Sequence, residues 1–145
     1  MNTRQELIGL TGCTGYIGGR LLPLLEQRGL PVRCLVRRPE DWIGRIGPNT
    51  SVVYADALDR DSLMKALEGV SVAYYLIHSL GASGDFEAME YRAAENFAAA
   101  AKACGVRRII YLGGLGDANA NLSTHLRSRL QVGHVLRSGG VPVIE

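Results

Sequence analysis

The sequence lacks any apolar run of about 18 residues, so we expect no segment of it to span a membrane. The residues from Met1 to Glu6 also lack the apolar stretch of a secretory signal peptide. The chain also lacks a strong excess of charge of one sign, since 16 basic and 14 acidic residues leave a net charge of +2. Such a balance gives no reason to expect nucleic acid or an acidic membrane as a partner.

Cysteine is scarce, and its spacing excludes two kinds of site. Cys13, Cys34 and Cys104 lie far apart, and no two of them have the spacing of a metal site or of a CxxC redox pair. An odd number of cysteines without a secretory signal indicates reduced thiols and a cytoplasmic location. We expect these side chains to fill the core or a loop.

Alternating apolar and amphipathic segments are what the chain does contain. Its 145 residues suit one domain over 1–145. Strands are predicted at 7–11, 32–36, 51–55, 72–77, 109–112 and from 141 onward, and helices at 16–27, from 59 or 61 to 67, at 85–104 and at 123–138. Alternation of strand and helix predicts right-handed crossovers and a parallel sheet with helices on both faces.

Three local details add to this prediction of strands and helices. Pro23 lies inside the first helix and should kink it or confine regular helix to its flanks. The long helix carries an apolar face at three- and four-residue spacing, made by Phe86, Met89, Ala93, Phe97, Ala100 and Cys104. The chain stops at Glu145 in an apolar run, so we expect a domain cut before a C-terminal substrate-binding part.

A glycine motif links the first predicted strand to the first helix. Its glycines are Gly12, Gly15 and Gly18. In this context the first glycine permits a tight turn, the second lets backbone N–H groups approach a phosphate, and the third lets helix and strand pack closely. The helix N-terminus adds unpaired donors, and Thr11 and Thr14 add hydroxyls. The motif predicts a Rossmann-type, doubly wound, three-layer α/β/α fold with strand order 3-2-1-4-5-6, binding the pyrophosphate of NADP or NAD.

The end of the second strand bears on the choice between these cofactors. An acidic residue there accepts from the ribose hydroxyl of NAD, whereas arginine accommodates the 2′-phosphate of NADP. Arg37 and Arg38 occupy the position, and the next acidic residue is Glu40. NADP(H) is therefore favoured over NAD, and the alternative is that both arginines are solvated surface charges. Asp56, after the third strand, either accepts from the adenine amino group or is an ordinary loop residue.

Three segments resemble those of the atypical and extended short-chain dehydrogenases/reductases. Residues 11–19 (TGCTGYIGG) resemble their TGATGxIG opening, while 74–79 (YYLIHS) and 105–116 (GVRRIIYLGGLG) resemble segments of the NmrA-like branch related to the NAD-dependent epimerases/dehydratases. The resemblance places a cofactor along the carboxyl ends of the strands. It implies pyrophosphate contacts from Gly12, Thr14, Gly15, Tyr16 and Ile17, a ribose phosphate at Arg37, adenine at Asp56 and Ala57, and the nicotinamide-side ribose at Ile77, His78 and Ser79. Gly18, Arg38 and Gly113 are further candidate cofactor-binding residues.

The catalytic residues of that family are not matched. The family uses a serine or threonine after the fifth strand and a Tyr-x-x-x-Lys pair on the next helix, but here Gly113 and Gly114 follow the strand. His125 and Arg129 have the four-residue spacing, and we predict that both face inward with Leu126 and Leu130. Arg129 can then anchor the ribose and His125 can donate a proton. Alternatively, both are packing or edge residues, and His78 merely ends a buried strand.

Two functions remain open at this stage. One is an NADP(H)-dependent oxidoreductase or epimerase/dehydratase relative with a degenerate triad and an unknown small substrate. The other is a non-catalytic NADP(H)-binding redox sensor or assembly factor. Fold alone does not choose between them. A flavin in the same crevice is less favoured, because the three glycines and Arg37 suit a nicotinamide dinucleotide better.

Overall fold

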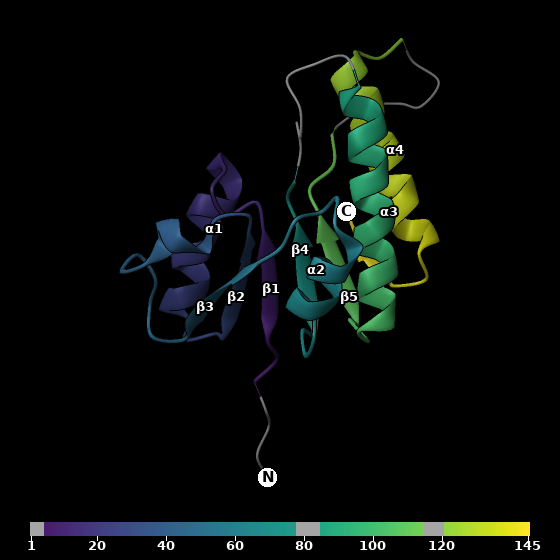
Figure 1. The fold of residues 1–145 in the computed structure, drawn as a ribbon. Helices are drawn as coiled ribbons and strands as arrows, with labels where there is room; N and C mark the ends of the chain where they lie inside the picture. The colour runs from purple at the N-terminus through teal and green to yellow at the C-terminus, as the bar shows by residue number, and fades with distance from the viewer. Residues whose placement is uncertain (1–4, 78–84, 115–120) are drawn as a thin grey trace.

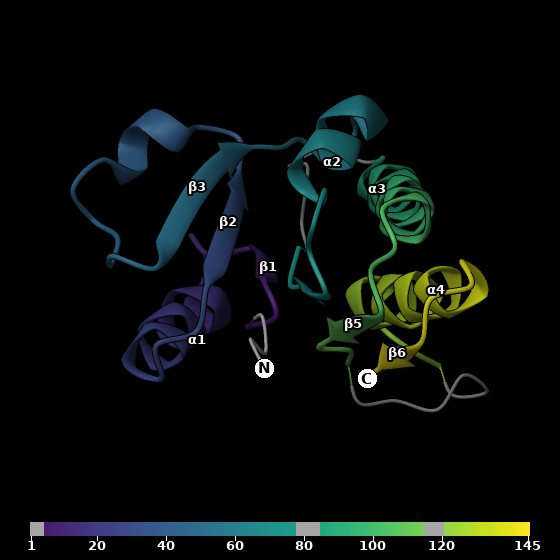
Figure 2. The ribbon, with the colours of Figure 1, turned by 90° about the horizontal axis from the view of Figure 1, so that it is seen from below.

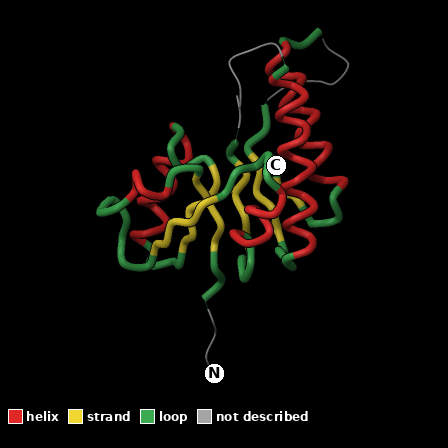
Figure 3. Tube along the Cα trace, viewed as in Figure 1, coloured by secondary structure: helices red, strands yellow, loops and turns green. Residues whose placement is uncertain are grey.

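The computed structural model describes residues 5–77, 85–114 and 121–145 and contains one six-stranded parallel sheet (Figures 1 and 3). Its strands are β1 (Ile8–Thr11), β2 (Val32–Val36), β3 (Thr50–Tyr54), β4 (Val72–Tyr75), β5 (Arg108–Tyr111) and β6 (Val143–Ile144). The helices are α1 (Tyr16–Gln27), a 3₁₀ turn η1 (Pro39–Trp42), α2 (Arg60–Ala66), α3 (Phe86–Ala103) and α4 (Thr124–Ser138). The observed strand order, β3-β2-β1-β4-β5-β6, confirms the predicted doubly wound topology.

Two apolar clusters, one on each face of the sheet, hold the layers together. On one face, Leu22 and Leu25 of α1 pack with Leu10, Val32 and Cys34 of the sheet. On the other, α2, α3 and α4 cover the sheet with a larger cluster (Figure 2). The connections from β1 to β3 run in one direction along the sheet and those from β3 to β6 run in the other, so the two sets lie on opposite faces, and a crevice opens at the carboxyl edge of β1 and β4 where the direction reverses.

The larger cluster is built around aromatic rings at the ends of two neighbouring strands. Tyr75 ends β4 and is 1% exposed; its ring centroid lies 4.8 Å from that of Phe97 on α3 and 6.1 Å from that of Tyr111, which ends β5. Burial of Tyr75 raises the pKa of its hydroxyl well above the ordinary value of 10. These contacts tie α3 to the edge of the sheet where the crevice lies.

The first helix has the predicted bounds and continues through Pro23, so regular helix is not confined to the flanks of the proline. A proline removes the hydrogen bond to the carbonyl four residues earlier, which is that of Gly19. Pro23 and Gly19 both lie on the exposed side of α1, where water can serve this carbonyl. The helix therefore tolerates the proline without ending.

Capping distinguishes the remaining helices. The carboxylate of Asp59, and not that of Asp61, caps α2 by accepting from the backbone N–H of Asp61 and of Ser62, at 3.1 and 3.3 Å. Ser123 caps α4 by accepting from Leu126 N.

None of the described helices combines the length and the apolar character needed to cross a membrane.

Candidate functional site

At two positions of the glycine loop, any side chain would collide with neighbouring backbone atoms, so only glycine fits there. Gly12 has a φ of 70°, and a Cβ on it would lie 2.7 Å from the carbonyl oxygen of Leu76 at the end of β4. A Cβ on Gly18 would overlap the carbonyl oxygen of Gly12 and lie 2.7 Å from its carbonyl carbon. The first glycine thus lets the loop approach β4, and the third lets α1 approach the loop.

Gly15 differs from Gly12 and Gly18, because it is exposed and has little protein packed against it. A Cβ on Gly15 would meet only the carbonyl oxygen of Gly12, at 3.3 Å. Gly15 is also the N-cap of α1: no side chain caps this helix, and its first turn has no acidic residue. Four N–H groups at a helix start lack intrahelical partners, and the dipole there favours an anion. The loop therefore fits a phosphate group at the N-terminus of α1.

Thr11 does not serve as a ligand donor, contrary to the expectation from sequence. Its side chain is 1% exposed. The hydroxyl donates to the carbonyl oxygen of Tyr74 at 2.8 Å and accepts from the N–H of Leu76 at 3.0 Å. Thr11 therefore joins β1 to β4 just below the glycine loop. Thr14 is exposed and remains available as a hydroxyl donor.

Arg37 and Arg38 follow β2, and both are exposed. The Nε of Arg38 lies 3.5 Å from a carboxylate oxygen of Glu40 and 3.3 Å from one of Asp41. No carboxylate among the described residues pairs with Arg37. Arg37 is therefore the better placed of the two cations to bind an added anion at this edge.

The end of β3 lies beside Arg37. Val36 pairs with Tyr54 in the sheet, and the N–H of Ala55 donates to the carbonyl oxygen of Val36 at 2.8 Å. Asp56 is half-buried, and its Oδ1 accepts from the N–H of Leu58 at 2.9 Å. Asp56 and the buried Ala57 thus sit on the edge that carries Arg37, and their contact with adenine stays a prediction.

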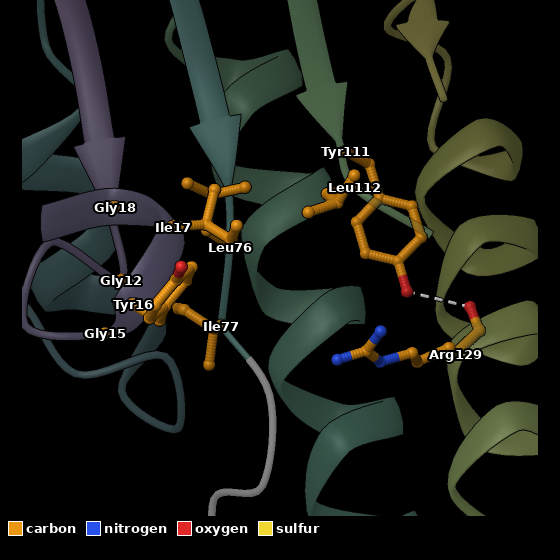
Figure 4. Close-up of a pocket in the computed structure, with 10 residues that line it drawn as sticks. All are labelled: Gly12, Gly15, Tyr16, Ile17, Gly18, Leu76, Ile77, Tyr111, Leu112 and Arg129. Carbon is orange, nitrogen blue, oxygen red and sulfur yellow. Dashed lines mark hydrogen bonds between the residues drawn. The ribbon is translucent and has the colours of Figure 1, made fainter. Parts of the chain in front are cut away.

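A cavity of about 290 Å³ lies between the glycine loop and the ends of β4 and β5 (Figure 4). Tyr16 and Ile17 line one side, while Ile77 and Leu112 line the strand ends. Arg129 comes from α4, and its guanidinium points across the cavity toward Ile77. It is the sole charged residue among the described residues that line the cavity, so a polar or anionic group there would meet it.

The backbone beside Arg129 is fixed by Tyr111. The Tyr111 hydroxyl donates to the carbonyl oxygen of Arg129 at 2.8 Å, which joins the end of β5 to α4. Burial raises the pKa of Tyr111 to about 12, while the nearby Arg129 guanidinium acts in the opposite direction. Tyr111 therefore stays protonated and acts as a hydrogen-bond donor at neutral pH.

His125 does not face inward, which corrects the prediction for α4. It is exposed, does not line the cavity, and its ring stacks on Phe86 with centroids 4.9 Å apart. Ser128 is the buried residue of this segment instead, at 2% exposure. α3 packs against the side of α4 that carries Ser128 and Val132, so Leu126 and Leu130 are only half-buried. The few apolar residues of α4 left its inward side ambiguous.

A buried polar pair joins α3 to α4 and was missed from the sequence. Ser128 donates to a carboxylate oxygen of Glu90 at 2.5 Å, and Glu90 is 6% exposed. The available signal was the spacing, because Glu90 lies four residues after Phe86 and three before Ala93 on the inward face of α3.

Of the other expected site residues, His78 and Ser79 lie outside the described residues. Gly113 is half-buried beside Glu145.

The fold and this site together define a Rossmann-type nucleotide-binding domain of the short-chain dehydrogenase/reductase kind. The sequence profile of the NAD(P)H-binding family matches residues 12–138. The chain therefore belongs to this NAD(P)H-binding family of atypical short-chain dehydrogenases/reductases, with NmrA-like reductases and epimerases among its relatives.

Similar proteins include both curated and solved ones. Sterol demethylase protein B of Methylococcus capsulatus is 30% identical over 116 residues, which are 77% of this chain and 35% of that protein. Triphenylmethane reductase of a Citrobacter species, solved with NADP(H), matches with a TM-score of 0.78 and 26% identity over 94% of this chain and 47% of its own. An Escherichia coli NADPH-dependent quinone oxidoreductase, solved with NADPH, matches with a TM-score of 0.77 and 25% identity over 94% of this chain and 46% of its own. This chain thus spans less than half of each of these three proteins.

Proposed function

We propose that this chain is the NADP(H)-binding part of a reductase. The observation that carries the preference for NADP(H) over NAD(H) is Arg37, a cation at the end of β2 with no carboxylate partner among the described residues. A 2′-phosphate binds a guanidinium through charge-assisted, bidentate hydrogen bonds. The two similar solved proteins named above were crystallised with NADP(H) or NADPH, which supports the same choice.

Each end of the cofactor has residues suited to it. The pyrophosphate would lie on Gly15 at the N-terminus of α1, and the adenosine on Arg37, Asp56 and Ala57. The nicotinamide half would enter the cavity beside Ile77, where Arg129 can donate to ribose hydroxyls or to the substrate. NADPH supplies a hydride when bound, and the protein residues bind, orient and exclude water.

A second function is supported by the position of His125. Its exposed ring lies outside the lining of the cavity, and glycines follow β5, so the residues at the family's catalytic positions offer no hydroxyl or imidazole to the cavity. That arrangement favours an NADP(H)-binding protein that senses or assembles without turnover. NADPH oxidation with a quinone or a triphenylmethane dye as acceptor tests the two: turnover by this chain supports the reductase and contradicts a sensor without turnover.

Titration with NADPH and NADH, followed by nucleotide fluorescence, tests the cofactor preference. We expect at least tenfold tighter binding of NADPH. Arg37→Ala should weaken NADPH binding roughly tenfold to a hundredfold, because a hydrogen bond to a charged group contributes about 1.5–3 kcal/mol, and should leave NADH binding unchanged. Arg28→Ala is the matched control, since this exposed arginine lies at the far end of α1. Equal affinity for both nucleotides, or an Arg37→Ala variant that binds like the parent, contradicts the assignment.

A further inference from the structure

The loop after β3, residues 56–59, is held by a dense set of polar contacts. Ser62 is buried, and its hydroxyl oxygen accepts from the N–H of Asp56 at 2.9 Å and lies 2.7 Å from the carbonyl oxygen of Asp59. The Asp56 carboxylate accepts from the N–H of Leu58, and the N–H of Asp59 donates to the carbonyl oxygen of Asp56. These contacts are local, and α2 and the loop itself supply them.

One contact to this loop comes from a distant part of the chain. Asn96, in the middle of α3, donates through Nδ2 to the carbonyl oxygen of Ala57 at 2.9 Å. Its Oδ1 accepts from the Arg60 guanidinium at 3.4 Å, which is a weak contact. Asn96 is 9% exposed, so its amide is largely removed from water.

A buried amide on this helix needs an explanation. Asparagine is a poor residue for a helix interior, and a buried amide costs free energy unless it is hydrogen-bonded. The neighbours of Asn96 on the inward side of α3 are apolar, among them Ala93 and Phe97. Local packing would be served by alanine there, whereas the bond to Ala57 needs a donor of this length.

The same helix also contacts α4, which carries Arg129. Glu90, six residues before Asn96, accepts from Ser128 beside Arg129. Six residues correspond to roughly 9 Å along a helix. Thus α3 contacts, through two buried polar side chains, the loop expected to meet adenine and the helix that carries Arg129. One rigid element sets the positions of both.

We propose that Asn96 is a positioning residue for the adenine end of the cofactor site. By fixing the carbonyl of Ala57 it holds the backbone of the loop, and with it Asp56, at the edge of the sheet that carries Arg37. The inference rests on the proposed function, because it needs the adenosine of NADP(H) to bind at this loop. Asn96 itself touches the loop and not the nucleotide.

Two halves of the cofactor serve as probes. Adenosine 2′,5′-bisphosphate reports the adenine end, and nicotinamide mononucleotide reports the other end, each titrated by NMR or calorimetry. Asn96→Asp keeps the shape of the side chain and removes the Nδ2 donor, so a carboxylate oxygen faces the carbonyl of Ala57. We expect adenosine 2′,5′-bisphosphate to bind about tenfold more weakly and nicotinamide mononucleotide to bind unchanged.

Ser128→Ala is the matched control, because it removes a second buried hydrogen bond made by α3. It should lower the free energy of unfolding comparably and leave the affinity for adenosine 2′,5′-bisphosphate within twofold. A purely structural role of Asn96 predicts instead that both variants change both affinities alike. If Asn96→Asp does not fold, Asn96→Ser carries the test: its hydroxyl is too short to reach Ala57, so the same selective loss is expected.

The outcomes separate the two proposals. If the parent chain binds adenosine 2′,5′-bisphosphate and the Asn96 variants bind it equally well, the positioning role is wrong and the proposed function stands. If the parent binds neither adenosine 2′,5′-bisphosphate nor NADPH, both proposals fall together. A selective loss in the Asn96 variants, with parent-like behaviour of Ser128→Ala, supports both.

Discussion

Substitution of Gly18 by alanine tests the steric basis of the glycine loop most directly. The added Cβ would lie 2.7 Å from the carbonyl carbon of Gly12 and 2.9 Å from the Cα of Cys13. Non-bonded carbons prefer about 3.5–4.0 Å, so α1 and the loop must separate by roughly 1 Å. Both obstructing groups are backbone, and neither can rotate away as a side chain would.

The expected magnitudes follow from that displacement. Overpacking of this kind costs about 1–3 kcal/mol, which for a chain of this size lowers the Tm by roughly 3–10 °C. Moving the N–H donors of the loop by 1 Å weakens a charge-assisted bond to phosphate, and the loss of one such bond reduces affinity about tenfold to a hundredfold. Thermal unfolding and NADPH titration measure the two effects separately.

Gly19→Ala provides the control within the same turn of α1. A Cβ there would lie 3.5 Å from the carbonyl oxygen of Cys13, an ordinary contact, and the position is exposed. Alanine is the better helix former by up to about 1 kcal/mol, so this variant should be at least as stable as the parent and bind NADPH equally well. If Gly18→Ala folds and binds NADPH like Gly19→Ala, the close approach of α1 is not what the motif requires.

Two further predictions concern stability. Thr11→Val, which keeps the shape of the side chain, should lower the free energy of unfolding by about 1–3 kcal/mol in a denaturant titration, since two buried bonds between β1 and β4 are lost; an unchanged midpoint would remove Thr11 from this role. Stability should also fall as pH rises from about 10 to 12, because the folded pKa of Tyr111 is raised to about 12 and the unfolded chain, with an ordinary pKa near 10, releases its proton first. Tyr111→Phe should make this decline shallower, and an equal slope would contradict the raised pKa.

The topology could be predicted from the sequence because its signals are local. Strand and helix periodicity, the glycine motif and the cap at Asp59 each arise within a few residues, and the order β3-β2-β1-β4-β5-β6 is that of the Rossmann-type fold that the glycine motif indicates. The edge that carries the candidate site follows from the same rule, since all parallel strands end there. Arg37 and Asp56 were found in this way, and their roles toward NADP(H) stay predictions.

Tertiary structure decided which side of each helix is buried and which polar groups are already satisfied. His125 was expected inward but is exposed, because α3 packs against the side of α4 that carries Ser128. Thr11 was expected to donate to a ligand, but β4 takes its hydroxyl. Asn96 and Ala57 are 39 residues apart, and no pattern within either segment indicates their bond.

The physical reason is the range of the interactions. Backbone periodicity, capping and glycine sterics depend on neighbours along the chain, and these were sufficient to predict a dinucleotide-binding loop at Gly12, Gly15 and Gly18. Burial and hydrogen bonding of a side chain depend on the elements that the fold packs against it, here β4 against β1 for Thr11, and α3 against the 56–59 loop and α4 for Asn96 and Ser128. The sequence by itself therefore determined the class of protein and the edge that carries the site, while the tertiary structure decided which side chains are free to act there.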